Sequence, residues 1–261
     1  MKNKSKSEKE KESMFLGLIT FAMTVAHYDQ KRKNDDKMPY AIHPMMVAMN
    51  PRSILNRMLS GADLLIARTV ALLHDVIEDC KEEDIARAWE YLLTHVSMKG
   101  VLGYDKNLFN IIPADTKNLK GKMLARVIDY CLEKCELDYR NGDINCMTVG
   151  GEIVSIIDEL TVPKGDHPDG HYKEGDKKAR KAWERSYGRI RKMSKIALCV
   201  TFNDKLYNMR SPMPGRDPTA AMMGYGEYLD NIFYVLSTHK GIAVTDMSDD
   251  VWEVMELYRN R

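Results

Sequence analysis

Four ionisable side chains stand close together in the otherwise apolar segment 71–79. His74 and Glu78 are four residues apart, and so are Asp75 and Asp79. On a helix each pair lies on one side, one turn apart. One interpretation is a helix end that carries acids into solvent. The apolar surroundings favour a second interpretation, a site for a metal or a charged partner, because burying unpaired charge is costly unless a metal or a partner compensates it.

Two further residues complete a candidate metal site. His43 directly precedes Pro44, which favours the first turn of a helix, so His43 is expected at a helix start. Asp204 lies in a segment with helical spacing, and Asn208 follows it by one turn. Two imidazoles and two carboxylates leave coordination positions open for water. This donor set suits a hydrolytic divalent ion such as Mn²⁺ better than a closed structural zinc.

The order and spacing of these motifs resemble the HD superfamily of metal-dependent phosphohydrolases. More narrowly, the chain resembles the hydrolase domain of RelA/SpoT homologues and the small alarmone hydrolases, including those of the metazoan SpoT homologue type. The similarity covers about residues 1–98 and 150–212, and five ordered segments carry it: 26–33, 39–44, 71–79, 152–161 and 204–210.

The resemblance implies a role for each matching residue. Glu78 and Asp79 match the pair that positions and activates the attacking water. Arg32 matches an arginine that stacks on the purine base, and Lys33 is its basic neighbour. The implied metal ligands are His43, His74, Asp75 and Asp204, and the other implied substrate contacts are Asn208 at the ribose, Ser211 near the nucleotide and Lys164 on the phosphate side. Without the resemblance, Arg32 and Lys33 would be interpreted as part of a solvated turn.

The chain also departs from the family pattern. The family usually approaches its last metal aspartate with Lys-x-Ala-Asp, whereas this chain has Thr-Phe-Asn-Asp at 201–204. About 130 residues separate Asp75 from Asp204, roughly twice the usual separation. The excess falls mainly in an insertion at about 99–149. Its middle, Met123–Tyr139, has helical spacing and is therefore expected to pack as an added helix.

Hydrophobic periodicity predicts an almost entirely helical chain with few strand signals. We expect a flexible tail at 1–12 and a single domain at 13–261 that includes C-terminal helices at about 213–261. Long loops are expected at 99–121 and 161–177, which contain glycines and prolines. The predicted helices are 14–31, 44–50, 53–59, 62–79, 82–97, 122–138, 150–160, 178–193, 194–210, 218–237 and 248–260.

Charge is balanced overall but not locally. The 261 residues contain 39 Lys and Arg against 38 Asp and Glu, a formal charge of +1, which makes nucleic acid an unlikely partner. Segment 171–192 is the exception, with nine basic and three acidic residues. It is either a solvated helix face or a surface that neutralises the phosphates of a nucleotide.

Composition predicts a soluble cytoplasmic protein. Hydrophobic residues make up 44%, and no apolar run reaches the roughly 18 residues that a membrane span needs. Five cysteines without a CxxC pair argue against a disulfide framework and favour a reducing compartment. The apolar stretch Met14–Ala26 has amphipathic spacing and is not interpreted as a secretory signal.

Taken together, we expect an all-α HD hydrolase with an inserted, partly helical segment. The expected reaction is Mn²⁺-dependent removal of pyrophosphate from the ribose 3′-oxygen of (p)ppGpp, without a synthetase half. Alternatives are an HD phosphohydrolase for another nucleotide, (p)ppApp or NADPH, and an antitoxin-like binding partner. The intact Glu78-Asp79 pair favours catalysis over binding alone. The sequence leaves open whether the chain forms a homo-oligomer.

Overall fold

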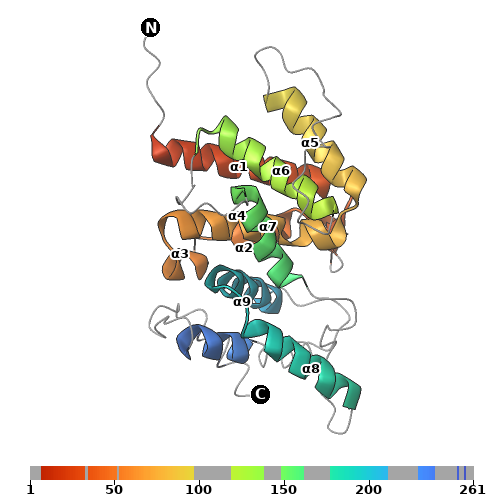
Figure 1. Cartoon of the computed structure of the whole chain (residues 1–261). Helices are drawn as coiled ribbons and strands as arrows, with labels where there is room; N and C mark the ends of the chain where they lie inside the picture. The colour runs from red at the N-terminus through yellow and green to blue at the C-terminus, as the bar shows by residue number, and fades with distance from the viewer. Residues whose placement is uncertain are drawn as a thin grey trace.

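The structure, a computed structural model, describes residues 7–32, 35–51, 53–96, 119–137, 148–161, 177–210 and 229–238, together with Trp252 and Glu256. These residues are mostly helical, so the predicted all-α class is confirmed at that level (Figure 1). The elements in chain order are α1 (Glu8–Ala26), β1 (Lys31–Arg32), β2 (Asp35–Pro39), α2 (Ile42–Met49), α3 (Leu55–Met58), α4 (Gly61–Asp79), α5 (Glu82–Val96), α6 (Leu119–Lys134), α7 (Val149–Leu160), α8 (Lys177–Ile190) and α9 (Lys195–Arg210).

Helix α4 is the centre of the arrangement. It packs against α1 on one side, α7 and α9 on others, and the short helices α2 and α3 (Figure 1). Its side chains are therefore buried nearly all round, including the unbroken run Thr69–His74. A helix that is apolar on every face is stable only inside a protein. The acids at its C-terminal end, Glu78 and Asp79, are exposed.

The first helix begins earlier than predicted. Helix α1 starts at Glu8, so residues 8–12 belong to the helix and not to a flexible tail. The Ser7 side chain accepts from the backbone N–H of Glu10, and the Glu10 carboxylate accepts from the backbone N–H of Ser7. This capping box satisfies two backbone donors and stabilises a polar first turn that apolar periodicity alone does not mark.

The same predicted helix also ends earlier than expected. Residues 27–31 leave the helix, and β1 pairs with β2 as a short antiparallel ribbon. The ribbon closes where the backbone N–H of Tyr40 donates to the carbonyl of Gln30 at 3.0 Å. Its residues are mainly Lys, Arg and Asp, which do not show the apolar and polar alternation of a half-buried strand.

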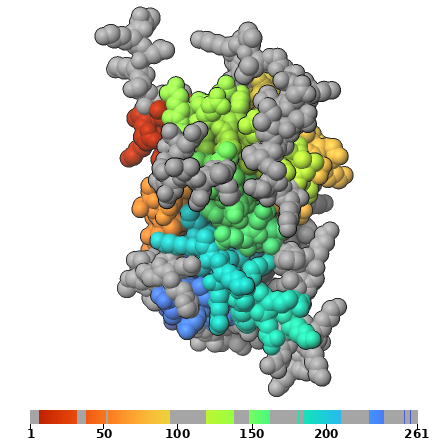
Figure 2. All heavy atoms as spheres, in the orientation of Figure 1, coloured from red at the N-terminus to blue at the C-terminus, as the bar shows by residue number. Residues whose placement is uncertain are grey.

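The helix predicted at 122–138 is present as α6, which begins three residues earlier and ends four residues earlier, at Lys134. Helix α6 contacts α1, α5 and α7, and Figure 2 shows the atoms of α6 and α7 as one continuous green surface on this face. The two helices meet closely at Gly150, whose backbone N–H donates to Asp129 Oδ1 at 2.8 Å. A Cβ at Gly150 would overlap the backbone oxygen of Ala125, so only glycine fits there.

Much of the two predicted loops lies outside the described residues. Residues 119–121 of the first loop belong instead to α6, because the helix begins at Leu119. The C-terminal residues 229–238 are helical and contribute Leu229, Ile232 and Val235 to the core. Within the described part of the chain, no helix has both the length and the apolar character required to cross a membrane.

We predict that Gly150→Ala lowers the free energy of unfolding by about 1–3 kcal/mol, because a methyl group forced into a close helix contact shifts the backbone. Gly17→Ala is the matched control. Gly17 is also helical but exposed, with open space around its missing Cβ, so alanine there should raise stability by about 0.5–1 kcal/mol. Urea unfolding measures both. Equal effects of the two substitutions would contradict the close approach of α6 and α7.

Candidate metal centre

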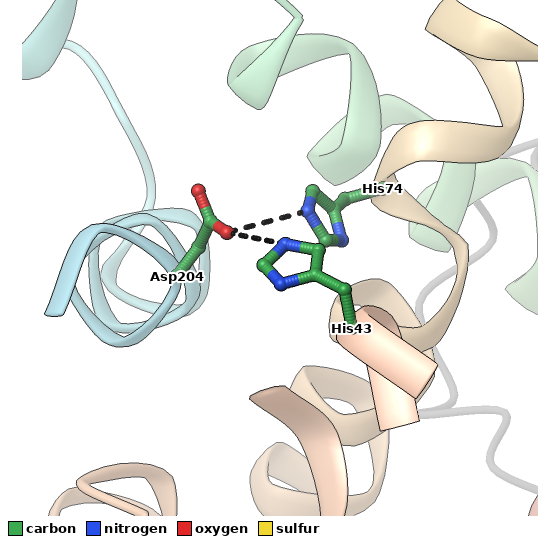
Figure 3. A group of neighbouring side chains, drawn as sticks. All are labelled: His43, His74 and Asp204. Atoms are coloured by element: carbon green, nitrogen blue, oxygen red, sulfur yellow. Dashed lines mark ion pairs between the residues drawn. The ribbon is translucent and has the colours of Figure 1, made fainter. Parts of the chain in front are cut away.

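Three buried side chains from three helices converge on one point. His43 comes from α2, His74 from α4 and Asp204 from α9, and one potential ligand atom of each lies within 4.8 Å of the others (Figure 3). His43 Nε2 is 2.9 Å from Asp204 Oδ1, and His74 Nε2 is 3.8 Å from the same oxygen. The exposed fractions are 5% for His43, 9% for His74 and 5% for Asp204. These residues therefore form a candidate metal site.

Local structure brings each member into place. His43 is the second residue of α2, which begins at Ile42, two residues before the predicted start at 44, and its backbone N–H donates to the Tyr40 carbonyl. Asp204 lies on α9, and its neighbour Asn203 donates through Nδ2 to the backbone carbonyl of Val47 at 2.6 Å. This buried hydrogen bond ties α9 to α2. Asn203 thus has a structural role, because its side chain joins the helices that carry Asp204 and His43.

The hydrogen bond of His74 indicates what its other nitrogen can do. His74 Nδ1 lies 2.8 Å from the carbonyl oxygen of Ala71, which can only accept a hydrogen bond, so Nδ1 carries a proton. In the neutral ring, Nε2 then presents a lone pair toward the oxygens of Asp75 and Asp204. Electron pairs that face one another need a proton or a cation between them. Metal-bound histidines are commonly oriented by this kind of carbonyl contact.

Asp75 borders the group of three. Its Oδ1 is 3.2 Å from His74 Nε2, and its Oδ2 is 4.0 Å from His43 Nε2. The side chain is 15% exposed, so it lies at the edge of the cluster, where it meets solvent. The four predicted ligands are thus brought together by the fold. Two imidazoles and two carboxylates fit a divalent cation by the chemistry of their donor atoms.

The electrostatics of the cluster match this donor set. Burial alone would raise the pKa of Asp204, but the Lys205 ammonium and the hydrogen bond to His43 hold that pKa well below its ordinary value. Burial disfavours the charged imidazolium of His74, yet the carboxylates of Asp75 and Asp204 outweigh it and raise the pKa of His74. The site therefore favours positive charge next to its carboxylates.

Two predicted catalytic acids lie beside the cluster on the last turn of α4. Glu78 and Asp79 are both exposed. Asp79 Oδ2 accepts a hydrogen bond of 3.0 Å from the Tyr40 hydroxyl, which also lies 2.7 Å from Asp75 Oδ2. One hydroxyl group thus connects Asp79 to a predicted ligand. The structure leaves the catalytic role of both acids as a prediction.

The predicted substrate contacts are only partly described. Asn208 Nδ2 donates to Asp204 Oδ1 at 3.0 Å, so its amide belongs to the cluster, and its ribose contact remains a prediction. Arg32 lies on β1, but its side chain is outside the described part. Lys33, Lys164 and Ser211 also fall outside the described residues.

The basic segment 171–192 is described only in part, as α8. Arg189 Nη1 donates to the backbone carbonyl of Thr161 at 3.3 Å, which connects α8 to the end of α7. In Figure 1, α8 lies below α9, with α9 between it and α4. The two interpretations of the segment, as a solvated face or a phosphate surface, therefore both remain predictions.

Sequence reasoning missed three residues around the cluster. Tyr40 bridges two acids, Lys205 Nζ lies 2.9 Å from Asp204 Oδ2, and the Tyr207 ring centroid is 5.8 Å from that of His43. All three lie within or beside the matched motifs. For Tyr207 the sequence did contain a signal, because Tyr207 and Asp204 are three residues apart and therefore lie on one helix face.

We predict that Mn²⁺ binds more weakly as the pH falls toward about 6.5, the ordinary histidine value. The nearby carboxylates raise the pKa of His74, so the metal-free protein keeps this ring protonated to a higher pH, and a ligand must lose that proton to bind metal. Calorimetric titration in buffers of different ionisation enthalpy measures the released proton. Identical Mn²⁺ affinity of the wild type at low and high pH would contradict the assignment.

Comparison of the chain with family models, curated proteins and solved structures finds no match in any of the three. The resemblance to HD hydrolases therefore depends on the residues of this chain. The structure adds that the side chains of His43, His74 and Asp204 are buried close together. They form a candidate metal site whose ion is not identified.

Proposed function

We propose that the chain is a metal-dependent hydrolase of the HD type that removes pyrophosphate from the 3′-position of (p)ppGpp, leaving GDP or GTP. The observation that carries this proposal is the convergence of His43, His74 and Asp204, with Asp75 at the edge. These are the residues on which the resemblance depends. Segments far apart in the chain have no local reason to bring two imidazoles and two carboxylates together.

Mn²⁺ is the proposed ion. When bound, it would lower the pKa of a coordinated water and polarise the attacked phosphoryl group. His43 and His74 would supply nitrogen donors, and Asp75 and Asp204 would supply oxygen donors. The Ala71 carbonyl holds the His74 ring in the tautomer that ligation requires.

The acid pair acts on the water in this proposal. Glu78 and Asp79 are exposed on the turn that follows His74 and Asp75, so both water and a nucleotide can reach them. Their carboxylates orient the water and take its proton as it adds to phosphorus. The bond from phosphorus to the ribose 3′-oxygen breaks, and that oxygen leaves with the proton that the carboxylates took from the water.

The remaining predicted residues hold the nucleotide. Arg32 stacks on the base, with Lys33 beside it, and Asn208 contacts the ribose. Ser211 lies near the nucleotide, and Lys164 meets the phosphates. Guanidinium and ammonium groups supply the positive charge that a polyphosphate requires, in a chain with no global basic field.

A cytoplasmic location is part of the proposal. None of the four described cysteines, Cys80, Cys131, Cys135 and Cys199, forms a disulfide. Burial raises the pKa of the Cys80 and Cys199 thiols to about 12, which makes them poor nucleophiles. Buried thiols of this kind suit a reducing compartment.

We predict that the purified protein with Mn²⁺ releases pyrophosphate from ppGpp, and that His74→Ala and Asp75→Ala abolish release and lower bound Mn²⁺. Each variant removes a proposed ligand that no neighbour can replace. Asp63→Asn is the matched control, because Asp63 is an exposed acid in the first turn of the same helix. Nucleotide chromatography and metal analysis give the two measurements, and the panel includes pppGpp, (p)ppApp and NADPH.

The outcomes of this assay separate the alternatives. Release from (p)ppApp or NADPH alone would keep the hydrolase and replace its substrate. Mn²⁺ binding without turnover of any nucleotide would refute the enzyme proposal and favour a binding partner. Full Mn²⁺ content and full turnover in His74→Ala would refute the site.

We predict that Glu78→Gln and Asp79→Asn lower kcat by about 10²- to 10⁴-fold, the usual contribution of a positioned acid or base, while Mn²⁺ stays bound. Both substitutions keep size but remove the charge and the ability to accept a proton. Glu83→Gln, an exposed acid on α5, is the control. Single-turnover kinetics measure the rate of the chemical step in each variant. Near-normal rates in both variants would leave the two acids without a catalytic role.

A further inference from the structure

Tyr40 occupies a position that neither the motifs nor the proposed mechanism explains. It lies between the end of β2 and the start of α2, three residues before His43. Its hydroxyl oxygen is 2.7 Å from Asp75 Oδ2 and 3.0 Å from Asp79 Oδ2. One phenol group thus touches a proposed metal ligand and a proposed catalytic acid.

The two oxygens of Asp75 face different partners. Oδ2 accepts from the Tyr40 hydroxyl at 2.7 Å and is 4.0 Å from His43 Nε2, whereas Oδ1 makes the closer approach to the cluster, 3.2 Å from His74 Nε2. The carboxylate of an aspartate can turn about its Cβ–Cγ bond. A hydrogen bond to one oxygen therefore also determines where the other oxygen points. The contact with Tyr40 therefore aims Oδ1 at the candidate metal site.

The hydroxyl also relates Asp79 to Asp75. A phenol has a single proton to donate, and two carboxylate oxygens lie within its reach. Two carboxylates that close together repel each other, and a shared donor between them lowers that cost. The pair is thus kept at a separation of one helical turn with both groups facing the same hydroxyl.

The Tyr40 ring is held firmly by its surroundings. Its centroid is 4.8 Å from that of the buried His27 ring, and its backbone N–H donates to the Gln30 carbonyl. The Gln30 side chain in turn accepts from His27 Nδ1 and donates to the backbone carbonyl of Asp79. The same short network therefore positions both the donor and the end of the helix that carries the acids.

We infer that Tyr40 is a positioning residue that orients the Asp75 carboxylate for metal binding and couples it to Asp79. This inference depends on the proposed metal centre and on the proposed roles of the acids. A purely structural role for Tyr40 would depend on its ring, which phenylalanine retains. The hydroxyl is what the inference requires, so removing only that group tests it.

The first test is Mn²⁺ affinity without nucleotide, measured by calorimetry. Tyr40→Phe should weaken binding about 10- to 100-fold, the usual effect of removing a group that orients a metal ligand. Tyr28→Phe is the matched control. Tyr28 is 75% exposed in the turn after α1, so its variant should bind Mn²⁺ as the wild type does. Unchanged affinity in Tyr40→Phe would overturn the inference, as would loss of its helical circular dichroism, because a positioning hydroxyl is not needed for folding.

The second test uses kcat at saturating Mn²⁺, in a double-mutant cycle with Asp79→Asn. If Tyr40 acts through Asp79, Tyr40→Phe lowers kcat with little change in KM, and it has a smaller effect once Asp79 is neutral. Fully additive effects would overturn the coupling. Failure of the proposed function can be distinguished from failure of the inference about Tyr40. Absence of hydrolysis in the wild type would refute the proposed function, while the calorimetric result would still decide whether Tyr40 orients Asp75.

Discussion

The buried negative charge of Asp204 is the constraint on which the rest of the site depends. A carboxylate that is 5% exposed must be compensated inside the protein. Lys205 from its own helix, the His43 ring from α2 and the Asn208 amide supply this compensation. Because His43 comes from a separate helix, its share of this compensation exists only while α2 and α9 stay packed. The chemistry of the cluster and the integrity of the fold are therefore linked.

Helix α4 makes that packing possible. Its burial on nearly every face places His74 where α2 and α9 meet it, and the Asn203 contact with the Val47 carbonyl joins α2 to α9 directly. Helix α6 adds a second layer: it packs on α1, α5 and α7, and α7 in turn contacts α4. Helix α6 thus supports the site indirectly, since none of the proposed ligands lies on it.

The solvent side of the site has a different construction. Whereas His43, His74 and Asp204 are enclosed, Glu78 and Asp79 are exposed at the last turn of α4, and Asp75 lies at the boundary. A short polar ribbon, β1 with β2, brings Tyr40 to this boundary. Enclosed donors hold a cation well, while exposed acids remain accessible to water and substrate. The hydrolase activity proposed above would need both properties close together.

The sequence by itself determined the local part of this arrangement. Periodicity predicted a helix in the α4 segment, with His74 and Asp75 one turn before Glu78 and Asp79, because spacing along a helix is a local property. The resemblance implied that His43 and Asp204 share one site, but spacing along the chain could not show that they lie 2.9 Å apart, since no local pattern records which helices pack together. Periodicity also missed Tyr40, whose role arises from a ribbon of charged residues with no strand pattern. Only the tertiary structure decided these contacts, because they depend on the packing of helices and a ribbon that are separated in the chain.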